Sequence, residues 1–111
     1  MKSVFKTIAL AAILAVPIAS FAAGDAAAGK DVYMKKCASC HAQTGEGKDA
    51  IAQPLKIKFK HLGSKEVQAQ TDADLKKGIV EGTGKMKAVK DMDAKAIEDV
   101  IAFLRTLKAP K

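Results

Sequence analysis

The sequence predicts an all-α domain of three main helices and long loops, without a sheet. Three segments carry helical signals, whereas one short segment alternates like a strand and has no second strand to pair with. The chain of 111 residues has no tryptophan, one tyrosine and four phenylalanines, which makes a thin core. Long loops are unusual in so small a domain, so we expect them to wrap around a buried group that the polypeptide does not supply.

Residues 1–22 have the pattern of a secretory signal peptide, which is expected to be removed. Two lysines precede an alanine-rich apolar run, and Pro17 ends the run. Ser20 and Ala22 supply the small residues of a signal-peptidase site, so cleavage is expected after Ala22. The run is shorter than the roughly 20 apolar residues of a membrane span. We therefore expect residues 23–111 to form one soluble domain in the periplasm, without stable membrane insertion.

The first helical pattern is GDAAAGKDVYMKKC, residues 24–37. Asp25 can cap its N-terminus, and three alanines follow. Gly29 lies inside this pattern, where glycine costs about 1 kcal/mol relative to alanine. Such a glycine often marks the close approach of another backbone or ring.

Two further helical patterns lie in the second half of the chain. In TDADLKKGIVEG, residues 71–82, Thr71 can cap the helix and Gly82 can end it. In DAKAIEDVIAFLRTLKAP, residues 93–110, Asp93 can cap a stripe of apolar residues spaced three and four apart. Each helix is therefore expected to turn one apolar face to the core.

Two long loops connect the helices. LKIKFKHL, residues 55–62, alternates apolar residues with lysines. A lone strand is not stable, so we expect this segment to lie extended across something apolar with its lysines in water. GTGKMKAV, residues 82–89, is a glycine-rich loop that carries Met86.

Both cysteines of the chain fall in CASCH, residues 37–41, with a histidine directly after the second. Four interpretations compete. A local disulfide needs only the two thiols. A thioredoxin-like dithiol should follow a strand and open a helix, whereas this pair follows a helix. A zinc site lacks a second cysteine pair, and only His61 could help.

The fourth interpretation is covalent attachment of haem, for which Cys-x-x-Cys-His is the signature, and we favour it. Cys37 and Cys40 lie three residues apart on a turn of helix, so each thiol can add to one vinyl group of the same porphyrin. His41 is then aimed at the iron from one face. The flat apolar ring would also supply the buried mass that the core lacks.

A second axial ligand is expected from a methionine or from His61. Met34 lies in the first helix, three residues before Cys37, and cannot reach the opposite face. Met92 precedes the last helix and can be plain core. Met86 is favoured over His61 because a glycine-rich loop lets the backbone approach the ring. A histidine–methionine pair raises the reduction potential of the haem.

With these motifs the chain resembles the small bacterial class I c-type cytochromes with one haem, of the c551/c5 kind. The resemblance covers residues 23–111 and rests on CASCH, on the loop GTGKM, and on Gly29, Tyr33 and Phe103. It implies the class I cytochrome c fold, with three main helices and long loops around one covalently bound haem c. It implies that Gly29 lets the first helix cross the last helix closely, with Tyr33 and Phe103 near the crossing.

The resemblance also assigns a role to Pro54. Its carbonyl is implied to accept a hydrogen bond from Nδ1 of His41, which would fix the orientation of the imidazole. Two features depart from many relatives: Lys87 follows Met86 where they have proline, and the chain has no tryptophan to bind the haem propionates.

The expected function is one-electron transport, without enzymatic activity, because the protein fills both axial positions of the iron. The formal net charge is +7, or about +5 without the two lysines of residues 1–22. This positive charge favours acidic redox partner proteins over nucleic acid for an exported haem protein. We expect a monomer. The lysines expected around the exposed haem edge are Lys35, Lys36, Lys48, Lys85 and Lys87.

Two other functions stay open. The chain could be a haem c subunit that accepts electrons from one periplasmic dehydrogenase, in which case the two would co-purify. It could be a haem enzyme or gas sensor, which needs a labile sixth ligand. Rapid binding of carbon monoxide by the native reduced protein would favour the sensor over the carrier.

Overall fold

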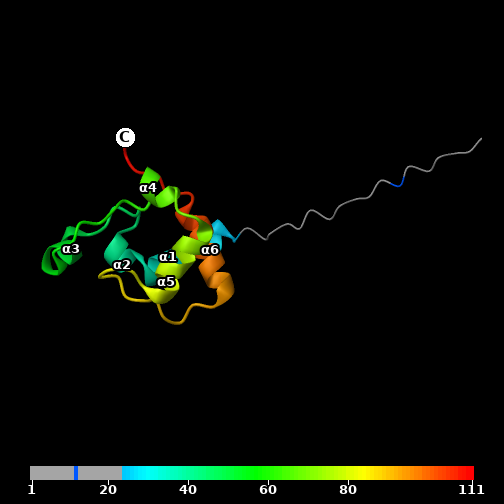
Figure 1. Ribbon diagram of the computed structural model, residues 1–111, viewed down its shortest axis with the longest axis horizontal. Coiled ribbons are helices and arrows are strands. Elements are labelled where there is room, and N and C mark those ends of the chain that lie inside the picture. The colour runs from blue at the N-terminus through cyan, green and yellow to red at the C-terminus, as the bar shows by residue number, and fades with distance from the viewer. Residues whose placement is uncertain (1–11, 13–23) are drawn as a thin grey trace, which may run out of the picture.

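The computed structural model describes Ala12 and residues 24–111. In this part of the chain the helices are, in order, α1 (Ala26–Lys36), α2 (Ala38–His41), α3 (Asp49–Leu55), α4 (Lys65–Gln68), α5 (Asp72–Glu81) and α6 (Ala94–Leu104) (Figure 1). No strand forms among the described residues, and one isolated bridge pairs Thr83 with Met86. The predicted all-α class is therefore confirmed. Apart from Ala12, the expected signal peptide and its cleavage point lie outside the described residues.

The first and last of these helices cross at close range, as predicted. Gly29 is buried in α1, and a Cβ placed on it would lie 1.8 Å from the carbonyl oxygen of Asp99 in α6. Just before α1, a Cβ on Gly24 would lie 2.1 Å from the carbonyl oxygen of Glu98. Two glycines therefore let the backbones of α1 and α6 touch where no side chain would fit.

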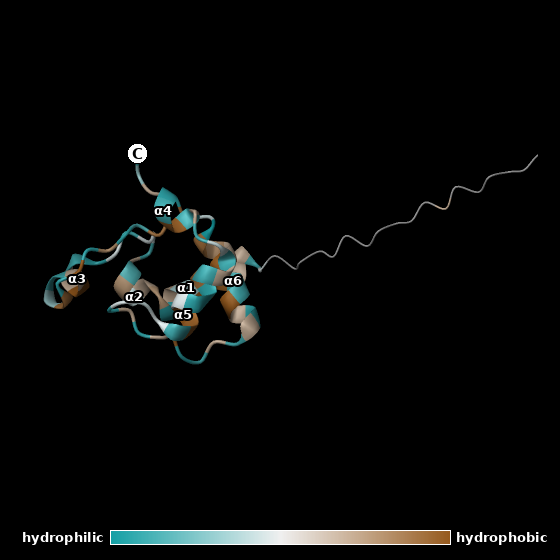
Figure 2. Ribbon diagram, in the orientation of Figure 1, coloured by the Kyte–Doolittle hydropathy of each residue, from teal (hydrophilic) through white to brown (hydrophobic). Residues whose placement is uncertain are grey.

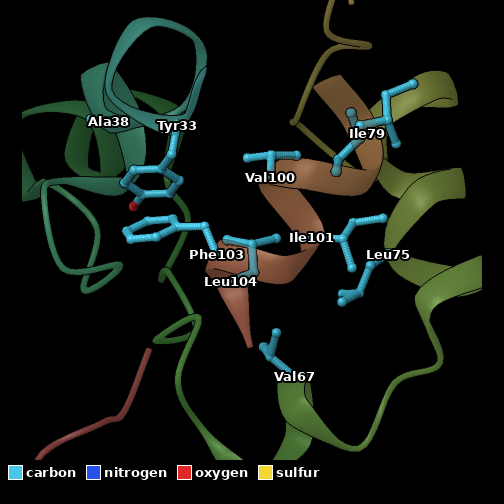
Figure 3. Close-up of a cluster of buried hydrophobic side chains, with 10 residues drawn as sticks. Tyr33, Ala38, Val67, Leu75, Ile79, Val100, Ile101, Phe103 and Leu104 are labelled. Carbon is cyan, nitrogen blue, oxygen red and sulfur yellow. The ribbon is translucent and has the colours of Figure 1, made fainter. Parts of the chain in front are cut away.

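The hydrophobic core lies on both sides of α6 (Figure 3). On the α1 side, the fully buried ring of Tyr33 packs against Phe103, with the ring centroids 5.0 Å apart. On the other side, Leu75 and Ile79 of α5 are buried against the same helix. This arrangement confirms that Tyr33 and Phe103 lie near the crossing.

The hydroxyl of Tyr33 also reaches the turn that follows α2. It donates a hydrogen bond of 2.5 Å to the carbonyl oxygen of Ala42, the residue directly after His41. Ala42 has φ 63° and ψ 174°, a conformation that L residues rarely adopt and that persists only when its surroundings hold it. The aromatic core thus holds the end of the CASCH segment in place.

Asp99 is a buried carboxylate that ties the start of α1 to α6. Its Oδ1 accepts the backbone N–H of Asp25 at 2.8 Å, and its Oδ2 lies 2.7 Å from Nζ of Lys95. Lys95, and after it the backbone N–H of Asp25, hold the pKa of the Asp99 carboxyl below its usual range.

The Asp99 contacts predict a loss of stability in acid. The pKa of Asp99 is lower in the folded protein than in the unfolded chain. Its contribution to the free energy of unfolding is therefore complete above the unfolded pKa of about 3.9, and it is lost as pH falls through the lower folded pKa. We expect Asp99→Asn to lower the melting temperature at pH 7 and to differ less from the wild type at pH 3. Asp31→Asn, at an exposed position of α1, is the control. Thermal unfolding that shows equal pH dependence for wild type and Asp99→Asn would contradict this prediction.

The main helices begin where their sequences predict, but α6 ends early. Thr71 and Asp74 form a capping box at the start of α5. α6 stops at Leu104, and the guanidinium of Arg105 then donates to the carbonyl oxygen of Gln68 at 2.9 Å and to the carboxylate of Asp72 at 2.7 Å. These contacts tie the end of α6 to the start of α5, and the chain leaves the helix there.

The short helices α3 and α4 were not predicted. α3 projects from the other helices, and brown, apolar residues appear on it as they do on α6 (Figure 2). The segment after it is extended, as predicted: Ile57 and Phe59 are half-buried, whereas Lys58 and Lys60 are exposed. Within the part of the chain that the structure describes, no helix has the length and apolarity needed to cross a bilayer.

Candidate functional site

A cavity of about 800 Å³ opens beside α2 and α5 and reaches the extended segment after α3. Its volume lies in the range of about 300–1,000 Å³ that is usual for small-molecule and cofactor sites. Much of its wall is apolar, and part of that wall comes from the stripes of α5 and α6. The apolar wall includes Ile51, Ile57, Phe59, Leu75, Ile79 and Leu104.

The CASCH segment places its two thiols and its imidazole on this cavity. Cys37 joins α1 to α2, and its carbonyl accepts the backbone N–H of His41 at 2.9 Å, so one helical turn carries the whole segment. Cys37, Cys40 and His41 all line the cavity, and both thiols are free.

The surroundings of Cys37 disfavour its thiolate form. Burial, and after it the neighbouring Cys40, raise the pKa of the Cys37 thiol to about 11. Reactive cysteines have a lowered pKa because the thiolate is the nucleophile and the metal ligand. Among the described residues no group of three or more His, Cys, Asp or Glu side chains comes together to hold a metal ion. Neither the dithiol nor the zinc interpretation is supported.

The imidazole of His41 is half-buried and neutral near pH 7. Burial lowers its pKa below the usual value, and a neutral imidazole is the form that binds metals. Its ring meets the ring of Phe59 edge-on, with the centroids 5.3 Å apart.

Nδ1 of His41 is buried and has no hydrogen-bond partner among the described residues. The expected bond to the carbonyl of Pro54 is therefore not formed in this structure. Pro54 is exposed inside α3, and α3 stands apart from the helices around His41 (Figure 1). A buried polar atom without a partner is unusual in a folded protein.

Of the four candidates for a second ligand, only Met86 lines the cavity. Met34 lies on α1 with 37% of its surface exposed, and Met92 packs against the hydrophobic core. His61 lies outside the wall of this cavity, and its Nδ1 accepts the backbone N–H of Gly63 at 2.9 Å.

Lysines form the charged part of the cavity lining, and we call them the lysine rim. Lys35 and Lys48, which were expected at this edge, lie outside the lining, and Asp74 is the one acidic residue of the lining. Lys58 and Lys60 belong to the rim but were not expected there, although they alternate with apolar residues in the sequence. The rim consists of Lys36, Lys58, Lys60, Lys85 and Lys87.

The residues present fit a covalently bound haem. Two thiols, an imidazole and a thioether share one cavity with an apolar wall. Cys-x-x-Cys-His is the attachment signature of haem, and histidine with methionine is a known pair of axial ligands.

Comparison with known proteins agrees with this chemistry. Residues 24–104 match the family described as cytochrome C oxidase, cbb3-type, subunit III. The structure is also similar to that of KustC0563 c-type cytochrome, with 23% sequence identity and a TM-score of 0.61. The alignment covers 73% of this chain and 98% of that one. At 23% sequence identity, this structural similarity supports the fold alone.

Proposed function

We propose that this protein is a periplasmic electron carrier. The chain belongs to the cytochrome C oxidase, cbb3-type, subunit III family and is a small c-type cytochrome with one covalent haem c. Cys37 and Cys40 would hold the haem, and His41 and Met86 would bind its iron. When bound, the haem takes up and releases one electron at its iron. The observation that carries this proposal is that all four side chains line one cavity.

The residues around the site suit a carrier better than an enzyme. His41 and Met86 would both bind the iron, which would leave no ligand position open for a substrate. The apolar wall from α5 and α6 keeps water from the ring, and the burial of His41 keeps its imidazole neutral and able to bind. No residue near the site is required to donate or accept a proton.

Met86→Ala tests the ligand set. We expect the oxidised holoprotein to lose the weak thioether-to-ferric-iron band completely and its reduction potential to fall. The reduced variant should bind carbon monoxide, which the wild type should not do. Met92→Ala is the matched control because this side chain packs on the core. If the reduced wild-type protein binds carbon monoxide rapidly, the result would favour a haem enzyme or gas sensor. If the protein forms a stable complex with a periplasmic dehydrogenase, the result would favour a haem c subunit of that enzyme.

The lysine rim supports an acidic partner. Of its members, only Lys60 has an ion-pair partner among the described residues: its Nζ lies 2.7 Å from a carboxylate oxygen of Glu66. Unpaired positive charge around the mouth of a site steers anionic partners toward it. We infer that the partner protein presents acidic residues to this rim.

Ferricyanide, an anionic oxidant, can probe the rim without a known partner. We expect Lys58→Glu with Lys85→Glu to slow oxidation of the reduced protein about tenfold at low salt. The difference in oxidation rate between this double variant and the wild type should shrink as salt is added, because at 0.1 M salt charges more than about 10 Å apart are largely screened. The control, Lys30→Glu with Lys108→Glu, makes the same charge change at two exposed lysines away from the cavity lining. Equal slowing in both double variants would show that net charge, not the rim, controls the rate.

A further inference from the structure

The loop that carries Met86 is closed by its own backbone. Thr83 donates its N–H to the carbonyl oxygen of Met86 at 3.0 Å, and Met86 donates its N–H to the carbonyl oxygen of Thr83 at 2.9 Å. Gly84 and Lys85 form the two-residue turn between them. This exchange of hydrogen bonds fixes the loop at Met86, although no proline follows it.

The start of the loop leaves no room for a side chain. Gly82 ends α5 at φ 80° and ψ 169°, a region of backbone conformation that is essentially restricted to glycine. A Cβ placed on Gly82 would lie 2.6 Å from the carbonyl oxygen of Met86 and 2.9 Å from the backbone nitrogen of Ala88. Both of these atoms belong to the backbone, so neither can move away by a change of rotamer as a flexible side chain would.

The end of the loop returns to the same helix. Val89 donates its backbone N–H to the carbonyl oxygen of Ile79 at 2.8 Å. At the other end, Gly82 donates its N–H to the carbonyl oxygen of Gly78 at 2.9 Å. Because both ends of the loop are held by the last turns of α5, an atom added at Gly82 has to displace the segment that contains Met86.

We propose that Gly82 is a positioning residue that sets the place of the Met86 thioether in the cavity. This inference rests on the proposed function, in which Met86 binds the iron. Gly82 touches no ligand itself and acts through the backbone of Met86. With any side chain at this position, Met86 moves and its bond to the iron weakens.

Gly84 offers a matched control in the same loop. It also has a positive φ, 55°, but a Cβ placed on it would have no heavy atom within 4 Å. Alanine at either position adds one methyl group and backbone strain, and the strain is greater at Gly82, whose φ and ψ are essentially restricted to glycine. Only alanine at Gly82 adds a collision with the backbone of Met86.

The experiment compares Gly82→Ala with Gly84→Ala in the haem-loaded protein. We expect Gly82→Ala to lose most of the thioether-to-ferric-iron band, to have a lower reduction potential and to bind carbon monoxide when reduced. Gly84→Ala should keep the wild-type band and potential. Both variants should melt at lower temperature, which a purely structural role would also produce. A Gly82→Ala protein with the full band and the wild-type potential would overturn the inference, as would equal loss of the band in both.

A second variant covers the case in which Gly82→Ala does not accumulate. One extra glycine between Lys87 and Ala88 lengthens the loop and leaves α5 untouched, and surface loops tolerate such insertions. We expect the inserted residue to weaken the band, and an unchanged band would overturn the inference. If the wild type has no thioether band and Met86→Ala changes nothing, the proposed ligand set fails instead.

Discussion

Replacing Gly29 with alanine is expected to destabilise the domain by about 3 kcal/mol, at the upper end of the usual range for overpacking. The added Cβ would lie 1.8 Å from the carbonyl oxygen of Asp99 and 2.9 Å from the backbone nitrogen of Val100. These atoms belong to α6, so the two helices would have to separate. Separating the helices would also weaken the packing of the Tyr33 ring against Phe103. Denaturant unfolding of the haem-loaded protein measures the loss.

Gly78→Ala is the matched control for this prediction. Gly78 lies inside α5 on the cavity lining, and a Cβ placed on it would meet only the methyl group of Thr83, at 4.0 Å, among the described residues. Helix propensity favours alanine over glycine by about 1 kcal/mol at both positions, so Gly78→Ala should cost far less stability than Gly29→Ala. Stabilisation by Gly29→Ala would show that α1 and α6 do not touch at Gly29.

Replacing Cys37 and Cys40 together with alanine is expected to abolish covalent attachment of the haem. The two thiols line the cavity from a single helical turn, and they are the only cysteines of the chain. Acid–acetone should extract all of the colour from the double variant and none from the wild type. The double variant should also accumulate poorly, because the apolar wall of the cavity would lose the group that covers it.

Ser39→Ala is the control for the cysteine variant, since Ser39 is exposed between the two cysteines. It should retain its haem through extraction. Each single cysteine variant keeps one thiol, so it should still hold a haem by one bond. Extraction of the haem from the wild-type protein would contradict covalent attachment through these residues.

The main helices could be predicted from sequence because their signals are local. Asp25, Thr71 and Asp93 cap α1, α5 and α6 as predicted, each through its own side chain. α3 and α4 have seven and four residues, too few to show a helical period, and α3 contains Pro54. At the early end of α6, Arg105 contacts residues more than 30 positions away, and no local pattern contains these contacts.

The site was predicted as far as its residues are neighbours in sequence. CASCH fixes which side chains share a turn, and the structure places Cys37, Cys40 and His41 on the cavity. The rim was predicted less well: Lys58 and Lys60 reach it through the path of the segment after α3, whereas Lys35 and Lys48 do not line it. The expected bond between Pro54 and His41 is not formed in this structure, in which Pro54 lies inside α3 and α3 stands apart from the helices around His41.

The crossing of α1 and α6 has a consequence for the order in which the molecule can form. Asp25 and Asp99, which join these helices, are 74 positions apart in the chain. Since a ribosome makes the chain from its N-terminus, α1 has no complete partner until α6 has been made. Until α6 packs on α1, the part of the cavity wall that α6 supplies is missing, so both thiols of CASCH are open on that side.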